Sequence, residues 1–380
     1  MSSPLELYLA IDCGATKTAA VLCLSSEVTV ARIVTKGSNF TYLGLDAFLD
    51  SIRTTVSSLL TTALQSPTPI ALPADPSTHV NPAGGSGTPP YRLQAAWLGV
   101  SGVDSSATIL LLLPRVSALL SIPIERLIIS NDTHLLAAPL RVLQDVKTAV
   151  VVVAGTGSIV SSFHEGPGDA LPEALARVGG WGWILGDEGG GFDIGRTAVR
   201  ALLTQEDSSA AVTPGTLREK VLKKFDVAEV MELLAAVHAP DSTSSQPREK
   251  RLSSLCPLVF QAAFEDGDPI AVHVLRECAY KLAKQVSAVL LSPSAKEVRV
   301  GTPSSLLVCV NQLCQQDQPR KVRAASSVLC IGGSLGGIDR YRETVLTALR
   351  EEGHVFRHVE VVADAARVGA NALVAVWRGK

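Results

Sequence analysis

The sequence has no apolar run long enough to cross a membrane. Its strongest apolar stretches, such as residues 109–113, stop well short of the roughly 20 residues that a spanning helix needs. Residues 1–6 lack the basic segment that opens a secretory signal, and they lead directly into an apolar stretch. We therefore expect no membrane partner.

Cysteine is scarce and shows no metal-binding spacing. The seven cysteines are scattered and no Cys-x-x-Cys pair occurs, so the pattern favours neither zinc nor iron–sulfur ligation. An odd number of scattered thiols suits a reducing compartment, where cysteine acts as a small buried apolar side chain. We therefore predict a cytoplasmic protein.

Charge is also limited. Only 18% of the residues are charged and the formal net charge is −2, which gives no electrostatic reason to expect nucleic acid as a partner. In contrast, 47% of the 380 residues are apolar. A chain of this length and composition predicts two globular domains with large buried sheets.

Two common nucleotide-binding signatures are missing. No Gly-x-x-x-x-Gly-Lys-Ser/Thr loop occurs anywhere in the chain. The stretch from Gly332 to Gly337 comes near a Gly-x-Gly-x-x-Gly fingerprint, but Ser334 stands where the middle glycine is needed. Neither a Walker-type nor a dinucleotide site is expected.

The most informative stretch is residues 149–158, Ala-Val-Val-Val-Val-Ala-Gly-Thr-Gly-Ser. Four consecutive valines predict a strand that is buried on both faces. The turn that follows, with two glycines and two hydroxyls, suits a phosphate or a sugar hydroxyl. An ordinary tight hairpin turn is the alternative for this stretch taken alone.

The same arrangement occurs near the N-terminus. An apolar run at residues 5–11 leads into Asp12-Cys13-Gly14-Ala15-Thr16-Lys17-Thr18, and a second apolar segment follows at residues 19–24. Two such hairpins, half a chain apart, predict a duplicated domain with a phosphate turn in each half. We expect the ligand to lie between the halves.

Hydrophobic periodicity predicts the other elements. We expect a helix over residues 46–64 with Asp46 as its N-cap, and a mobile Pro/Ser/Gly-rich insertion at 65–90. Residues 241–251 are also typical of disorder. Further strands are expected at 32–35, 93–99, 127–130, 327–331 and 359–363, and further helices up to about 120 and at 135–143, 192–203, 252–291, 340–351 and 369–377.

Acidic residues follow three of the predicted strands. Asp12, Asp104 and Asp132 each come where a strand ends, and ligands of open α/β sheets bind at the carboxyl ends of strands. A loop rich in glycine, at residues 178–191, also holds two tryptophans and two carboxylates. A flexible linker avoids tryptophan, so we interpret this loop as a binding loop. Trp181 could instead be a core residue, and Trp183 suits the core better.

Taken together, these motifs resemble those of a known superfamily. Asp12-x-Gly14-x-Thr16-Lys17-Thr18, Gly155-Thr156-Gly157-Ser158 and Gly332-Gly333-Ser334 resemble the two phosphate elements and the adenosine element of the sugar kinase, Hsp70 and actin superfamily. With Asn131-Asp132, Gly179-Gly180-Trp181-Gly182 and Gly186-Asp187-Glu188-Gly189, the sequence is similar to the BadF/BadG/BcrA/BcrD ATPase group, and within it to the eukaryotic N-acetylglucosamine kinases.

The resemblance implies an α/β fold of two ribonuclease-H-like (actin-like ATPase) domains, with a mixed sheet in each and an interdomain cleft. The first domain would comprise residues 1–143 and about 366–380, because the last helix of the family returns to the N-terminal domain. The second would comprise residues 144–365, with the nucleotide and sugar loops.

The resemblance also implies ATP-dependent phosphorylation of N-acetyl-D-glucosamine at the 6-hydroxyl. Asp132 resembles the general base, although it could also cap the following helix. The implied metal ligand is Asp12, which would hold Mg²⁺. The implied sugar contacts are Asn39, Asp132, Ser158, Gly180, Trp181, Gly182 and Asp187. The implied ATP contacts are Gly14, Ala15, Thr16, Lys17, Thr18, Thr156, Gly332, Gly333, Ser334 and Gly337.

Other functions stay open at this point. Glucosamine or another hexose derivative could be the substrate. An activator ATPase of the same group would need a cysteine cluster for an iron–sulfur centre, and a nucleotide switch would give no reason for the Trp/Asp-rich loop. A homodimer is compatible with the sequence but is not predicted by it.

Overall fold

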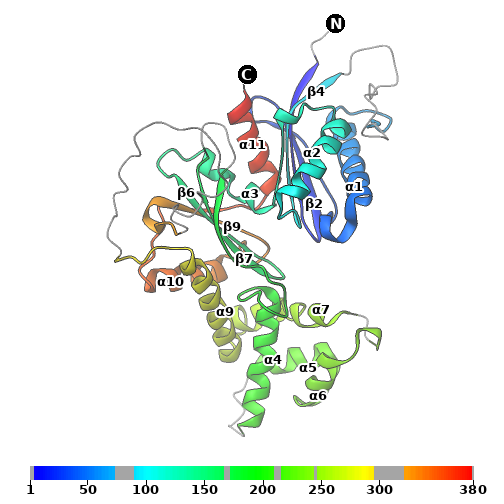
Figure 1. Cartoon of the computed structure of the whole chain (residues 1–380). Coiled ribbons are helices and arrows are strands. Elements are labelled where there is room, and N and C mark those ends of the chain that lie inside the picture. Colours follow the sequence, from blue (N-terminus) through cyan, green and yellow to red (C-terminus); the bar gives the residue numbers. More distant parts are fainter. Residues whose placement is uncertain are drawn as a thin grey trace. The chain divides into compact units, whose positions relative to one another are not determined.

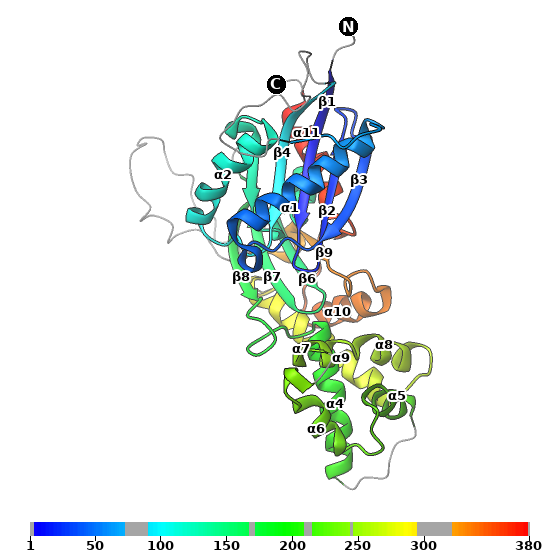
Figure 2. The ribbon, with the colours of Figure 1, turned by 90° about the vertical axis from the view of Figure 1, so that its right-hand side faces the viewer.

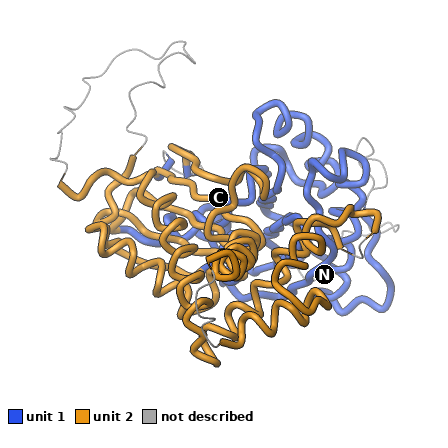
Figure 3. The backbone as a smooth tube through the Cα atoms, turned by 90° about the horizontal axis from the view of Figure 1, so that it is seen from below, with its two compact units in different colours: residues 1–144, 165–172, 362–380 blue, residues 145–164, 173–361 orange. Residues whose placement is uncertain are grey.

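The computed structural model describes residues 4–72, 90–166, 172–208, 215–243, 246–294 and 321–378. The chain divides into two compact units: unit 1 comprises residues 1–144, 165–172 and 362–380, and unit 2 comprises residues 145–164 and 173–361 (Figure 3). Each unit has its own five-stranded sheet and its own hydrophobic core. Residues 73–89, the larger part of the expected insertion at 65–90, lie outside the described residues.

Unit 1 alternates strands with helices and ends with a helix from the far end of the chain (Figure 1). Its elements are β1 (Leu5–Cys13), β2 (Lys17–Cys23), β3 (Thr29–Lys36), α1 (Phe40–Ala63), β4 (Tyr91–Val100), α2 (Ser106–Leu120), the 3-10 turn Ile124–Arg126, β5 (Leu127–Ser130), α3 (Thr133–Leu136), the 3-10 turn Ala138–Arg141 and α11 (Ala365–Trp377).

The sheet of unit 1 has the strand order β3-β2-β1-β4-β5. The hairpins β1–β2 and β2–β3 are antiparallel, whereas β4 and β5 run parallel to β1. Helices α1 and α2 cover one face and α11 covers the other (Figures 1 and 2). The sheet is therefore mixed, and its central strand β1 is covered on both sides.

The first helix begins earlier than its apolar periodicity predicts. The prediction that Asp46 is the N-cap was wrong, because α1 begins at Phe40 and the Asn39 side chain caps it by accepting a hydrogen bond from the Tyr42 N–H. Gly44, with φ +72°, breaks the regular helix after this first turn. The apolar face predicted between residues 48 and 60 is confirmed as buried.

Unit 2 continues the chain with a second set of strands and a group of helices. Its elements are β6 (Thr148–Ala154), β7 (Ser158–His164), β8 (Glu173–Gly179), α4 (Gly191–Asp207), α5 (Thr216–Phe225), α6 (Glu232–His238), the 3-10 turn Asp241–Thr243, α7 (Arg248–Ser253), α8 (Cys256–Phe264), α9 (Pro269–Ala288), the 3-10 turn Ala324–Ser326, β9 (Ser327–Gly332), α10 (Asp339–Glu351) and β10 (His358–Val361).

The sheet of unit 2 repeats the topology of unit 1. Its order is β10-β9-β6-β7-β8, with antiparallel β6–β7 and β7–β8 pairs and with β9 and β10 parallel to β6. Thus β6 matches β1, β7 matches β2 and β9 matches β4. The duplication predicted from two similar hairpins is confirmed, although the third strand, β8, was not predicted from the sequence.

The predicted helix over residues 252–291 consists of separate helices. The chain breaks near Ser254 and Leu255 and again at residues 265–268, where Gly267 has φ +68°. Asp268 then caps α9 by accepting a hydrogen bond from the Ala271 N–H at 2.9 Å. The predicted helix at 135–143 is also only two short turns, Thr133–Leu136 and Ala138–Arg141, and Pro139 lies at the start of the second.

The interpretation of residues 241–251 as disordered was wrong for the part that is described. Arg251 of α7 is only 5% exposed, and its guanidinium donates hydrogen bonds to the carbonyls of Val237, Ala239 and Pro240. It also pairs with Asp241 at 3.0 Å. One buried arginine therefore orders a segment whose composition is otherwise polar.

Replacing Arg251 should destabilise unit 2. Arg251→Met removes a buried guanidinium and leaves the carbonyls of Val237, Ala239 and Pro240 without their charged donor, so we expect the free energy of unfolding to fall by about 2–4 kcal/mol. Arg248→Met, on the exposed side of the same helix, should change it by less than about 0.5 kcal/mol. Urea denaturation of both variants checks this, and equal small effects would contradict the structural role of Arg251.

Candidate functional site

Parallel pairing brings two of the predicted acidic residues to one edge of the unit 1 sheet. Asp12 lies beside Gly99 across the β1–β4 pair, and Gly99 lies beside Ser130 across the β4–β5 pair. Asp132 follows two residues after Ser130. The carboxyl ends of three parallel strands therefore place Asp12 and Asp132 at the same edge, where α/β sheets bind ligands.

Asp132 precedes helix α3, but its side chain makes no capping hydrogen bond. The neighbouring Asn131 takes that place, because its Oδ1 accepts hydrogen bonds from the Thr133 N–H at 3.1 Å and the Thr133 hydroxyl at 2.8 Å. The Asn131 amide in turn donates to Asp104 at 2.9 Å. Capping, the alternative role for Asp132, is thus carried by Asn131.

Both carboxyl groups are harder to ionise than an ordinary aspartate. Burial raises the pKa of Asp132 to about 6, with Asp104 contributing in the same direction. Burial, together with the negative charge of Asp132, raises the pKa of Asp12 to about 7. Burial lowers the pKa of His134 to about 4, so this ring is neutral near pH 7 and adds no positive charge.

Asn39 connects the start of α1 to the same edge. Its amide donates a hydrogen bond to the Ser101 hydroxyl at 3.0 Å, while its Oδ1 caps α1. The Ser101 side chain also interacts with the Asp132 carboxyl and lowers its pKa in part. Asn39, Ser101 and Asp132 therefore form one polar group in unit 1.

The first predicted phosphate turn joins β1 to β2. Gly14, Ala15 and Thr16 form the turn, and Lys17 opens β2 with an exposed side chain. Thr18 differs from them because it is fully buried and its hydroxyl is 2.5 Å from that of Ser38. The buried contact between the Thr18 and Ser38 hydroxyls therefore holds the chain in place just after the turn.

The second phosphate turn, in unit 2, interlocks with the glycine-rich loop at residues 186–191. Asp187 is buried, has φ +65°, and accepts a hydrogen bond from the Ser158 N–H at 3.2 Å. A Cβ on Gly157 would lie 2.6 Å from the Asp187 carboxylate, so glycine is required there. The Ser158 hydroxyl donates to the Glu188 carbonyl at 2.7 Å. Burial raises the pKa of Asp187.

The two tryptophans of this region have different environments. Trp181 is 64% exposed, so the core alternative for this residue was wrong. Trp183 packs edge-on against Phe192, with ring centroids 5.3 Å apart, and its predicted core position is confirmed. Gly180 donates its N–H to the Ser158 carbonyl at 2.9 Å, and the Gly182 carbonyl accepts from Gly186 at 2.8 Å.

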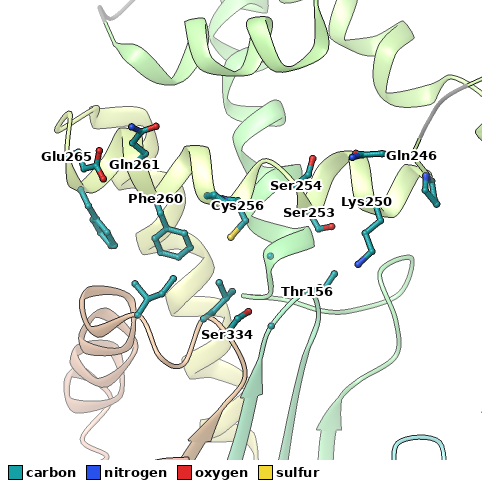
Figure 4. Close-up of a pocket in the computed structure, with 17 residues that line it drawn as sticks. Thr156, Gln246, Lys250, Ser253, Ser254, Cys256, Phe260, Gln261, Glu265 and Ser334 are labelled. Carbon is teal, nitrogen blue, oxygen red and sulfur yellow. The ribbon is translucent and has the colours of Figure 1, made fainter. Parts of the chain in front are cut away.

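A pocket of about 720 Å³ lies in unit 2 beside the second phosphate turn (Figure 4). Figure 4 shows Phe260, Gln261 and Glu265 toward one end and Lys250 near Thr156 at the other. The lining residues are Gly155, Thr156, Gly191, Gln246, Pro247, Lys250, Ser253, Ser254, Cys256, Pro257, Phe260, Gln261, Phe264, Glu265, Ser334, Leu335 and Ile338. The pocket thus has aromatic rings together with Gln261 and Glu265 at one end and a lysine at the other.

The late glycine-rich turn forms part of this pocket. Gly332 ends β9, and Gly333 has φ +84° with no room for a Cβ against the Ala154 carbonyl. The Leu335 N–H donates to the same carbonyl at 2.9 Å. Ser334 lines the pocket, and Gly337 is close to the Ser334 carbonyl.

Most pocket residues outside the glycine turns were missed from the sequence. Cys256, Phe260 and Phe264 recur every four residues, which sequence reasoning assigns to a helix facing the core. Gln246 and Lys250 lie in the segment expected to be disordered. The spacing of these three residues indicates one face of a helix, but it does not distinguish a pocket wall from an ordinary core face.

Comparison with known proteins adds to this geometry. The chain is 28% identical over 286 residues to N-acetyl-D-glucosamine kinase of Dictyostelium discoideum, covering 75% of this chain and 79% of that protein. It is 30% identical over 169 residues to the N-acetylmuramic acid/N-acetylglucosamine kinase of Clostridium acetobutylicum, covering 44% and 51% of the two proteins. The chain is therefore similar in sequence to N-acetylglucosamine kinases. No family model matches it.

Solved structures share the fold of this chain. A Chromobacterium violaceum protein with a provisional N-acetylglucosamine kinase name matches with a TM-score of 0.57 at 20% identity, covering 97% and 99% of the two chains. A ROK family glucokinase of Streptomyces griseus matches with a TM-score of 0.50 at 15% identity, covering 96% and 97%. The predicted fold class, two actin-like α/β domains with mixed sheets, is confirmed.

Two other features are absent from the described part of the chain, a cluster of metal ligands and a membrane-spanning helix. In the ranges between residues 4 and 378 that the structure describes, no group of three or more His, Cys, Asp or Glu side chains is arranged to hold a metal ion. Across those same ranges, every helix is too short or too polar to span a membrane.

Neutralising Asp132 should stabilise the protein at alkaline pH. Its carboxyl has a pKa of about 6 in the folded state against 3.8 when unperturbed, so the folded state binds this proton more tightly and loses stability as pH rises from about 4 to 6. Asp132→Asn should therefore raise the free energy of unfolding by about 1–2 kcal/mol at pH 8 and hardly at all at pH 4.

Urea denaturation without magnesium or nucleotide measures this difference. Asp46→Asn, an exposed carboxylate in α1, is the matched control and should have little effect at either pH. A loss of stability in Asp132→Asn at pH 8 would contradict the account of a strained, buried carboxylate.

Proposed function

We propose that this protein transfers the terminal phosphoryl group of ATP to the 6-hydroxyl of N-acetyl-D-glucosamine. The matched relative from Dictyostelium discoideum is named N-acetyl-D-glucosamine kinase, and the similarity extends over 79% of that protein. The sequence motifs and the pocket of unit 2 support the same chemistry. We expect the protein to act in the cytoplasm.

The observation that carries the proposal is the state of Asp132. Asn131 performs the capping that an aspartate before a helix usually performs, and the buried Asp132 carboxyl lies with the Ser101 side chain at the strand-end edge of unit 1. Its pKa of about 6 suits a general base near neutral pH, because it is mostly ionised there yet accepts a proton readily. We assign it the role of accepting the proton from the sugar's 6-hydroxyl as the phosphoryl group is transferred.

The sugar contacts follow from the polar groups around both glycine turns. In unit 1, Asn39 and Asp132 offer amide and carboxylate partners for sugar hydroxyls. In unit 2, Ser158 and Asp187 are held together by the Ser158 N–H to carboxylate hydrogen bond. The backbone of Gly180 and Gly182 and the exposed ring of Trp181 would cover the acetylated face.

The unit 2 pocket suits a nucleotide in one orientation. The aromatic end, at Phe260 and Phe264, would take the adenine base, and the end at Thr156 and Lys250 would take the phosphates. Among the described residues, no carboxylate lies within ion-pair distance of Lys250, so its charge is available to the ligand. Backbone amides of the β6–β7 turn would add phosphate contacts within unit 2, and Gly14–Thr18 are the proposed phosphate ligands of unit 1.

Mg²⁺ fits the unit 1 edge. Asp12 is a partly buried carboxylate whose pKa is raised to about 7, so a divalent cation beside it would relieve unfavourable burial and repulsion. Mg²⁺ needs only one or two carboxylates when phosphate oxygens complete its shell. When bound, it would neutralise charge on the phosphates, and this chain's own residues position the reactants.

Stimulation of ADP release by sugar tests the proposal. With Mg·ATP, N-acetylglucosamine should raise the rate by at least about tenfold over no sugar, and more than glucosamine, N-acetylmannosamine or glucose. A greater effect of glucosamine would keep the kinase and change the substrate. Equal slow hydrolysis with every sugar would overturn the kinase assignment.

A further inference from the structure

A single buried side chain connects the nucleotide pocket to the glycine-rich loop within unit 2. Tyr341 lies near the start of α10 and is 1% exposed. Its ring packs edge-on against Phe260, with centroids 5.5 Å apart and planes at 89°. Phe260 lines the pocket, so one side of the Tyr341 ring supports the wall that would contact the nucleotide.

The hydroxyl of Tyr341 contacts the glycine-rich loop at residues 186–191. Tyr341 Oη donates a hydrogen bond of 2.8 Å to the carbonyl oxygen of Gly189. Both groups are buried, so the bond is sheltered from water. Burial also raises the pKa of Tyr341 well above its ordinary value, which keeps the hydroxyl protonated as a donor.

Gly189 is a restrained point of the loop. Its N–H donates to the fully buried Asp193 carboxylate at 3.0 Å, and its φ is +77°. A Cβ there would lie 2.6 Å from the Leu282 Cβ and 2.8 Å from the Cys278 carbonyl oxygen. Asp193 holds the Gly189 amide and Tyr341 holds the Gly189 carbonyl. A displacement of the Tyr341 side chain would therefore move the backbone next to Gly189.

The adjacent backbone carries the proposed sugar ligands. Asp187 and Glu188 immediately precede Gly189, and they hold Ser158 through the Ser158 N–H and hydroxyl. Gln285 of α9 adds a hydrogen bond from its amide to the Glu188 carbonyl at 3.1 Å. The Tyr341 hydroxyl is thus two residues away from Asp187 along a loop with little freedom.

We infer that Tyr341 is a positioning residue that couples nucleotide binding to sugar binding, through Phe260 on one side and Gly189 on the other. The inference rests on the proposed function and concerns how its two substrates influence each other. A nucleotide that presses against Phe260 favours one placement of the Tyr341 ring, and this placement sets the Gly189 carbonyl and with it Asp187. Each substrate should therefore tighten the binding of the other by the same factor.

Tyr341→Phe tests the inference because it removes only the hydroxyl and keeps the ring against Phe260. We expect the KM for N-acetylglucosamine and the KM for ATP, each measured with the other substrate saturating, to rise by a common factor of about five, as for loss of one net hydrogen bond, with kcat within about twofold of wild type. Calorimetry should show that a non-hydrolysable ATP analogue tightens sugar binding to the wild type and no longer does so in the variant.

Two further variants separate positioning from general stability. Tyr91→Phe, at a largely buried tyrosine of unit 1, should leave both KM values and the coupling unchanged. Phe260→Leu keeps the Tyr341 hydroxyl but loses the ring contact, so it should raise the KM for ATP and reduce the coupling, with sugar affinity in the absence of nucleotide unchanged.

The outcomes distinguish this inference from the proposed function. Wild-type protein without sugar-stimulated ADP release would contradict the proposed function. Active wild-type protein whose sugar binding ignores the nucleotide, or a Tyr341→Phe variant with unchanged sugar KM and coupling, would overturn the role of Tyr341 alone. If Tyr341→Phe does not fold, the Phe260→Leu variant tests the same inference, and unchanged coupling between nucleotide and sugar in that variant would overturn it.

Discussion

Close approach of two backbone segments in unit 2 is the constraint on which the proposed site depends. The β6–β7 turn and the loop at residues 186–191 meet where a Cβ on Gly157 would lie 2.6 Å from the Asp187 carboxylate. A Cβ on Gly190 would likewise lie 2.7 Å from the Gly157 carbonyl carbon. Because neither glycine has a side chain, Asp187 can accept a hydrogen bond from the Ser158 N–H and hold the β6–β7 turn and the loop at residues 186–191 together.

The repeated sheet topology explains why the reactive groups gather at strand ends. Each unit has a central strand followed by an antiparallel hairpin, with two parallel strands on its other side. This order leaves a glycine turn after β1 and β6 and collects polar residues at the carboxyl ends of the parallel strands. In unit 1 these are Asp12 and Asp132, and in unit 2 the turn after β9 lines the pocket.

Strands and glycine turns could be predicted from the sequence because their signals are local. Four valines before Gly155, and β-branched or apolar runs before Asp12 and Gly332, specify strand followed by turn whatever surrounds them. The N-cap of α1 could not be predicted, because Asn39 and Asp46 are both good caps and only Gly44 divides the helix between them. The role of Arg251 could not be predicted either, since its acceptor carbonyls lie 11 to 14 residues earlier in the chain, at residues 237–240.

The candidate site also contains residues that could be predicted from the sequence and residues that could not. Asp132, Asp187 and Thr156 stand in short motifs and were identified because those motifs resemble the motifs of a known family. Lys250, Phe260 and Tyr341 were not, because a lysine in a polar segment and aromatic residues at helical spacing have ordinary structural explanations. Their significance comes from what they face, and only the packing of α7, α8 and α10 beside the glycine turns shows it.

The most direct test of the account is the turnover of Asp132→Asn in the presence of both substrates. The variant should bind ATP and N-acetylglucosamine with nearly wild-type affinity by calorimetry, because its fold and shape are kept. Its kcat should fall by at least about a hundredfold, as expected for loss of a general base. Turnover near the wild-type rate, with binding intact, would contradict the central claim that Asp132 accepts the proton of the sugar hydroxyl.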